Sequence, residues 1–131
     1  VGQSAMANNA SSGVGNTALG FEALKSNSPG DENVAIGKSV LSFNSTGSSN
    51  TAIGAYAGDL NFSGSNNSFF GYKSGKFSSG NNNIFLGPES GSNTTGSNLL
   101  YIENSNSTTP LIYGEFDNDL LRINGTLNIN N

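Results

Sequence analysis

Three carboxylates alternate along one short segment near the C-terminal end of the sequence, at Glu115, Asp117 and Asp119. In an extended chain they would face the same way, and carboxylate oxygens are ligands that calcium prefers. However, the segment lacks the glycine and the distal glutamate of an EF-hand loop, and the chain has no Gly-Gly-x-Gly-x-Asp repeat of calcium-binding proteins. We therefore interpret the segment as an Asx-rich turn and expect no metal site and no cofactor.

A second motif, Gly37-Lys38-Ser39, imitates the end of a phosphate-binding loop. The position five residues before Gly37 is Glu32, where such a loop needs a glycine so that its backbone amides can wrap the phosphate. His, Cys and Trp are absent, which removes histidine-based triads, the usual general base near neutral pH, and thiolate chemistry. The scattered carboxylates suggest no spaced catalytic pair, so we expect no enzyme.

The charge of the chain argues against polyanionic partners. The formal net charge is −4, and the five Lys and Arg residues do not cluster along the sequence. Nucleic acids and anionic membranes are bound by clustered basic residues. No apolar run approaches the roughly 20 residues of a membrane-spanning helix. We therefore expect neither nucleic-acid binding nor direct membrane insertion by this segment.

A sequence repeat with a period of about 17 residues organises most of the chain. Its mark is an Asn-x-apolar-apolar-Gly pattern that recurs at nearly constant intervals. The copies start at Asn16, Asn33, Asn50, Asn67 and Asn83, with a degenerate sixth copy at Asn98. Each unit reads as a short strand ending in Gly, a second extended stretch such as residues 21–24, and a polar turn. This pattern predicts an all-β fold, a parallel β-solenoid or β-roll whose coils stack about 4.8 Å apart.

Side chains within each predicted strand alternate between two faces, and both faces are at least partly apolar. We assign one face to a core ladder inside the solenoid, made of Leu19, Ile36, Ile53, Phe70 and Leu86. The opposite face carries Ala18, Ala35, Ala52, Phe69 and Phe85. A coil of this length encloses little core, and an exposed apolar face is an association site. We therefore expect the chain to associate with copies of itself.

The repeat pattern ends near Ser107, so we divide the chain into a repeat domain, residues 1–107, and a C-terminal segment, residues 108–131. Residues 111–116 and 120–123 flank a polar turn and predict a hairpin. Asn124-Gly125 is a strong turn signal and predicts a further strand at residues 126–129. Such a β-meander would cap the last coil or link it to another module.

The repeat carries a resemblance to known proteins. The segments 32–39 and 49–54 resemble the Asn-Ser-Val-Ala-Ile-Gly repeat in the heads of YadA-like trimeric autotransporter adhesins, and the likeness covers roughly residues 13–102. The adhesin repeat is a little shorter, and the longer unit here also resembles repeats of secreted surface proteins and of tail fibres of phages or injection machines. Both resemblances imply a homotrimer, and the adhesin heads are left-handed β-rolls. They also imply an extracellular location, on a cell surface, in a secreted filament or in a virion or injection-machine fibre.

These observations favour a structural and adhesive fibre module that recognises a glycan or protein receptor on a host-cell surface. One alternative is an ice- or mineral-binding solenoid, which needs a regular row of one residue type, whereas the second motif position is mixed (Thr17, Val34, Thr51, Ser68, Ile84). Another alternative is a polysaccharide-active solenoid enzyme, which would show clustered carboxylates or a basic residue facing a groove.

The best ligand candidates are aromatic residues that lie in or beside turns, where sugar-binding surfaces often place rings. They are Phe43, Tyr56, Phe62, Tyr72 and Phe77. The competing interpretation is packing between adjacent coils or chains, because large aromatic side chains dominate the burial at interfaces.

Overall fold

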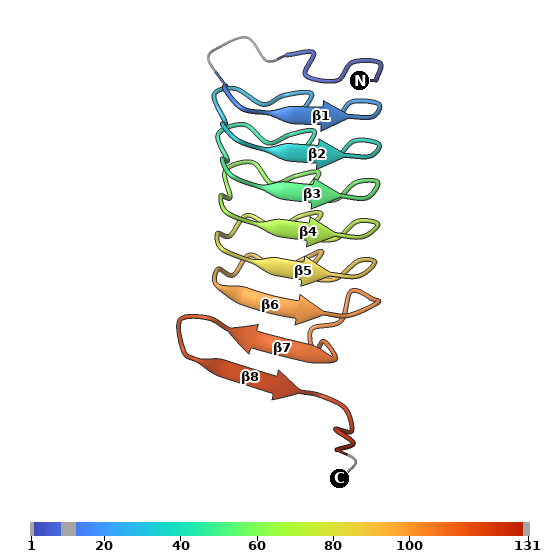
Figure 1. The fold of residues 1–131 in the computed structure, drawn as a ribbon, viewed down its shortest axis with the longest axis vertical. Helices are drawn as coiled ribbons and strands as arrows, with labels where there is room; N and C mark the ends of the chain where they lie inside the picture. The colour runs from blue at the N-terminus through green and yellow to red at the C-terminus, as the bar shows by residue number, and fades with distance from the viewer. Residues whose placement is uncertain (1, 9–12, 130–131) are drawn as a thin grey trace.

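The computed structural model describes residues 2–8 and 13–129, which form a rod of stacked coils (Figure 1). Each coil contributes one short strand to a single sheet, and successive strands pair in parallel from β1 to β6. These strands are β1 (Thr17–Leu19), β2 (Val34–Ile36), β3 (Thr51–Ile53), β4 (Ser68–Phe70), β5 (Ile84–Leu86) and β6 (Leu99–Ile102). The predicted all-β solenoid is confirmed, and its coils have the length of the sequence repeat.

Two further strands, β7 (Ile112–Glu115) and β8 (Leu120–Ile123), extend the same sheet in antiparallel pairing. The predicted hairpin is therefore present, and Figure 1 shows it below the last coil. The predicted strand at residues 126–129 is wrong, because this exposed segment forms no strand. Asn124 instead bonds back to the start of the hairpin: its amide and its side-chain Nδ2 donate to the carbonyls of Leu111 and Pro110, at 2.9 and 2.7 Å.

After each of the strands β1 to β5 the chain turns at a Gly and returns along the opposite side of the coil, which we call the return wall. The prediction of an extended stretch here is wrong, because left-handed residues recur along it, with φ of 55° at Glu22 and 49° at Leu24. The backbone still bonds from coil to coil: the Leu24 amide donates to the Val40 carbonyl at 3.0 Å, and the Ser39 amide to the Phe21 carbonyl at 2.7 Å. Both walls of the rod are therefore held by backbone hydrogen bonds.

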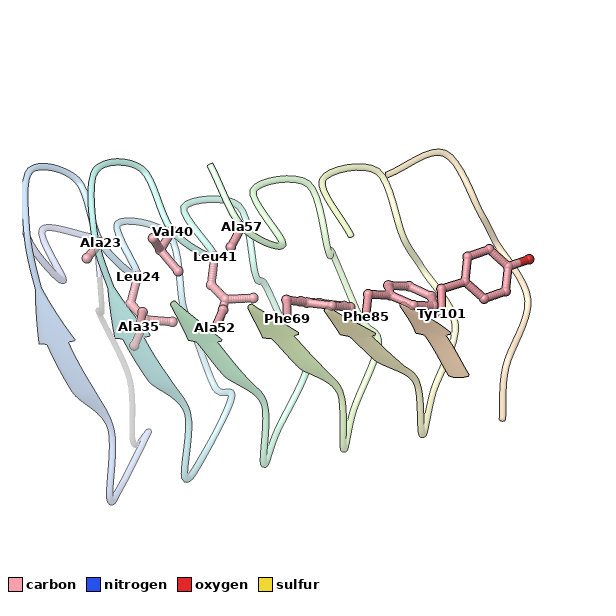
Figure 2. Packing of buried hydrophobic residues seen from close by; sticks show 10 residues of the cluster. All are labelled: Ala23, Leu24, Ala35, Val40, Leu41, Ala52, Ala57, Phe69, Phe85 and Tyr101. Atoms are coloured by element: carbon pink, nitrogen blue, oxygen red, sulfur yellow. The ribbon is translucent and has the colours of Figure 1, made fainter. Parts of the chain in front are cut away.

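The interior of the rod is lined by the face that the sequence analysis placed outside. Ala35, Ala52, Phe69 and Phe85 are fully buried and point inward (Figure 2). The predicted core ladder of Leu19, Ile36, Ile53, Phe70 and Leu86 lies on the outer face of the sheet, and three of its members stay 50% (Leu19), 38% (Ile53) and 45% (Leu86) exposed. That assignment is wrong because the opposite face of the strands packs against the buried side chains that the return wall supplies to the core.

The two walls fill the interior with complementary volumes. In the second coil the small Ala35 on the strand is accompanied by the buried Leu41 on the return wall. In the fourth coil the large Phe69 lies against Gly75, where an added Cβ would approach the Phe69 ring to 2.5 Å. Further along, the rings form a row from Phe69 to Tyr113, with centroids 5.6, 5.2 and 5.4 Å apart through Phe85 and Tyr101.

The motif asparagines form a buried ladder beside the sheet. Asn50 Oδ1 accepts the backbone amide of Asn67 at 3.0 Å, and Asn50 Nδ2 donates to the Gly64 carbonyl at 2.8 Å. The ladder ends at Leu99, whose amide donates to Asn83 Oδ1 at 3.0 Å. The sixth copy therefore starts one residue later than its predicted start at Asn98, which is a left-handed residue with φ of 62°.

Candidate functional site

An apolar column, which we call the outer stripe, runs along the outward face of the sheet. The strand pairing places one apolar residue of every strand in this column. The eight residues are Leu19, Ile36, Ile53, Phe70, Leu86, Ile102, Ile112 and Ile123. With strands about 4.8 Å apart the stripe is roughly 34 Å long. All eight side chains are half-buried or exposed, so the outer stripe is accessible in the single chain.

The column next to the outer stripe changes character along the rod. Its first four residues include Thr17, Thr51 and Ser68, whereas Ile84, Leu100 and Leu121 lie at the C-terminal end. Two hollows of about 330 and 290 Å³ indent this end of the face. The first is lined by Leu86, Gly87, Ile102, Glu103, Asn104 and Leu111, and the second by Leu100, Gly114, Glu115, Phe116, Asp119, Leu120 and Leu121. The outer face is thus most apolar, and best shaped to receive another side chain, near β6 to β8.

The five predicted ligand aromatics lie in or beside the return wall, outside the core. The structure brings four of them together as pairs: Phe43 and Phe62 have ring centroids 6.5 Å apart, and Tyr56 and Tyr72 have centroids 6.2 Å apart in an edge-to-face arrangement. Phe77 joins neither pair, and its ring centroid lies 4.9 Å from Lys76 Nζ. All but the half-buried Tyr56 are exposed.

Lysines gather around the tyrosine pair. The Nζ atoms of Lys38 and Lys76 lie 5.5 and 5.6 Å from the ring centroid of Tyr56, and Lys73 Nζ lies 4.9 Å from that of Tyr72. Basic residues that are dispersed along the sequence are therefore brought near one another by the stacking of the coils. An alignment of the repeats could have predicted this proximity. Lys38 and Tyr72 each follow the motif glycine of their coil by one residue, and Tyr56 and Lys73 follow it by two, so these residues fall in neighbouring columns of stacked coils.

Two of these lysines form no close ion pair in the described part of the chain. Lys73 lies 3.7 Å from a Glu89 oxygen, whereas no carboxylate of the described residues comes within 4.0 Å of Lys38 or Lys76. A hydrogen bond with the Tyr56 hydroxyl is the largest cause that raises the pKa of Lys38. Lys38 is therefore cationic over the physiological pH range.

Asp59 is a buried carboxyl on the return wall. It accepts a hydrogen bond from the Ser42 hydroxyl. Burial raises the pKa of Asp59, and the bond from Ser42 opposes that shift in part. Because its carboxylate is engaged with Ser42 and shielded from solvent, we assign Asp59 to the packing of the coil rather than to ligand binding.

The alternating carboxylates of the C-terminal hairpin serve local structure. Glu115 accepts hydrogen bonds from the Tyr113 hydroxyl and from Asn118 Nδ2. The bond from Tyr113 is the main cause that lowers the pKa of Glu115, and its counterpart raises the pKa of Tyr113 to about 12. Among the described residues no group of three His, Cys, Asp or Glu side chains could hold a metal ion. The hydrogen bonds of Glu115 therefore stabilise the turn of the hairpin.

The geometry therefore offers two accessible surfaces, the outer stripe and the lysine and tyrosine cluster. No family model, curated protein or solved structure matches the chain. The described residues contain no helix of the length and apolar character needed to cross a membrane. The function must accordingly be argued from what the two surfaces can bind.

Proposed function

We propose that the chain is a structural and adhesive module of an extracellular fibre, in which copies of the chain pack together along their outer stripes. The observation that carries the proposal is the uninterrupted apolar column on all eight strands. A sheet face that meets water normally carries polar side chains, in alternation with the apolar side chains that face the core. Eight apolar residues in one accessible row therefore indicate a surface that is covered in the assembled protein.

The core of the single chain supports the same proposal. The buried apolar residues of each coil are few, and in the third coil the two facing positions are Ala52 and Gly58. A rod with so small an interior gains stability when it buries its second apolar face against another copy. Packing of outer stripes would extend the hydrophobic core from one chain into the assembly.

The number of copies, the location and the adhesive role rest on the resemblance of the repeat to trimeric adhesin heads and tail-fibre repeats. That resemblance favours three copies, packed around a common axis, as the first model to test. It also favours a position outside the cell and a receptor on another surface. The ice-binding alternative is not favoured, because the column beside the outer stripe is chemically mixed. For the enzymatic alternative, Glu115 and Asp119 line one hollow, but Glu115 is engaged by Tyr113 and Asn118 in the hairpin.

Light scattering coupled to size-exclusion chromatography tests the assembly directly. We expect a single species with a mass about three times the 13.4 kDa of one chain. The mass should stay constant on dilution through the micromolar range, because large apolar interfaces bind tightly. A folded species with the mass of one chain would refute the proposal.

A further inference from the structure

The cluster of lysines and tyrosines forms a second surface on a different wall of the rod from the outer stripe. We call it the anion patch and define it by Lys38, Tyr56, Tyr72, Lys73 and Lys76. These residues come from three successive coils, so the patch extends along the rod axis. An elongated patch of this kind suits an extended ligand better than a small compact one.

The rings of the patch provide stacking faces for sugars. Tyr56 and Tyr72 meet at an interplanar angle of 80° with their centroids 6.2 Å apart, and the Tyr72 side chain is 47% exposed. A tyrosine offers a rigid apolar face together with a hydroxyl that forms hydrogen bonds. The C–H face of a pyranose ring stacks on such a face, while its hydroxyl groups bond to the polar edge.

The lysines of the patch indicate that its ligand carries negative charge. Lys38 and Lys76 both lie close to the Tyr56 ring, and the separation of their Nζ atoms cannot exceed the sum of their distances from its centroid, 5.5 and 5.6 Å. The two ammonium groups therefore lie within reach of neighbouring sugars of one chain. Among the described residues neither lysine has a carboxylate within 4.0 Å, and Glu22 and Asp59 act on Lys38 and Lys76 only from farther away, although the chain as a whole has a net charge of −4. Cations that form no close ion pair on an acidic protein indicate a local site for an anionic group.

We propose that the anion patch binds an acidic polysaccharide, whose sugar rings stack on Tyr56 and Tyr72 while its carboxylate or sulfate groups pair with Lys38 and Lys76. This inference deepens the adhesive part of the proposed function and rests on it for the source of the ligand. Copies of the chain in one fibre would each present the patch, so the fibre would bind a repeating polysaccharide with avidity.

A nucleic acid would need a different surface. Its binding depends mainly on the number of phosphates that are neutralised, and the acidic chain would repel a long, densely charged polymer. The patch instead combines few charges with aromatic faces, which suits a ligand with one charge per sugar or per disaccharide.

Binding to immobilised polysaccharides tests the inference on the whole chain. The probes are hyaluronan for carboxylated sugars, chondroitin sulfate for sulfated sugars, dextran as the neutral control and single-stranded DNA as the nucleic acid. We expect hyaluronan or chondroitin sulfate to bind and dextran and DNA not to bind. A chain that binds neither acidic polysaccharide, or that binds DNA as tightly, would overturn the inference.

Three variants identify the residues involved. The double variant Lys38→Gln/Lys76→Gln and the single variant Tyr56→Ala should each weaken polysaccharide binding by about tenfold or more, since they remove charge-assisted or stacking contacts. The control Lys25→Gln removes the same type of charge from a lysine already paired with Glu22 at 2.7 Å, and we expect a change of less than about twofold. An equal loss in the Lys25 variant, or no loss in the Tyr56 variant, would overturn the inference.

The two proposals fail separately. Light scattering on the same variants reports assembly, whereas the polysaccharide assay reports the patch. Normal mass with no binding would reject the anion patch alone, and binding by a chain with the mass of a monomer would reject the assembly alone.

Discussion

Phe69 and Gly75 face each other inside the fourth coil, six residues apart, and show how single residues set the shape of the core. The equivalent pair in the second coil is Ala35 and Leu41, so the large side chain has moved from the return wall to the strand. Leu41 accepts a left-handed conformation with φ of 47°, and Gly75 has φ of 59°. A leucine at position 75 would therefore meet a backbone that the same fold already tolerates with leucine.

We predict that this pair behaves as an exchangeable unit. Phe69→Ala should lower the free energy of unfolding by roughly 3 to 5 kcal/mol through the cavity it leaves. Gly75→Leu should destabilise the chain because its side chain collides with the Phe69 ring. The double variant should recover much of the loss, since it recreates the pair of the second coil, and urea unfolding measures all three. Strictly additive losses would show that the two residues do not share one space.

Asp59 makes stability depend on pH in a defined direction. Its pKa is raised in the folded chain, so it contributes most to stability below its unfolded pKa, and this contribution is lost as the pH rises through the folded pKa. Asp59→Asn should therefore raise the melting temperature at pH 7, and the difference should shrink toward pH 4. The exposed Asp117→Asn should change the free energy of unfolding by less than about 0.5 kcal/mol. A lower melting temperature for Asp59→Asn at pH 7 would contradict this account.

At the scale of elements, the repeat predicted the positions of the strands correctly but assigned the wrong strand face to the core. The motif places β1 to β5 correctly, because each strand follows its asparagine. In the other copies a turn glycine precedes the motif asparagine by three residues, as Gly80 precedes Asn83. In the sixth copy Gly96 stands three residues before Leu99, so the register follows the glycine rather than the asparagine.

The faces were misassigned because both are apolar. One signal was available in the sequence. The pair Ala35 and Leu41 in the second coil is replaced by Phe69 and Gly75 in the fourth, and this exchange of a large side chain between two positions six residues apart indicates that both positions face the same interior.

The surfaces were also only partly predictable. The aromatic candidates came from their place beside turns, but their pairing with lysines arises between coils. Sequence neighbours do not report such contacts, whereas columns of the aligned repeat do. The left-handed residues of the return wall had no signal in composition, since Glu22 and Leu24 are ordinary helix or strand residues in other settings.

The asparagine ladder supplies the element-scale prediction. Asn50→Ala removes the acceptor for the Asn67 amide and the donor for the Gly64 carbonyl, both in the interior. Each buried group left unpaired costs about 1 to 3 kcal/mol, so the free energy of unfolding should fall by roughly 2 to 6 kcal/mol. Chemical unfolding followed by circular dichroism provides the measurement. The exposed Asn106→Ala is the control, and a similar loss in both variants would mean that the ladder has no special role.

On the scale of the whole molecule, the rod separates two surfaces. The outer stripe lies on the sheet, and the anion patch lies on and beside the return wall. Copies that pack along their sheets would therefore leave the patch open to a ligand. This separation makes the central claim, that the outer stripe joins the copies, testable without disturbing the fold of each coil.

The mass of the Ile53→Asp variant, measured by light scattering, tests that claim most directly. Ile53 lies on the outer stripe with 38% of its side chain exposed, so the new carboxylate is solvated in a single chain but would be buried and unpaired between copies. We predict a species with the mass of one chain and a circular dichroism spectrum close to that of the parent. Ala52→Asp, which places the same charge in the interior, should instead abolish folding. An Ile53→Asp variant that keeps the mass of the parent assembly would contradict the account.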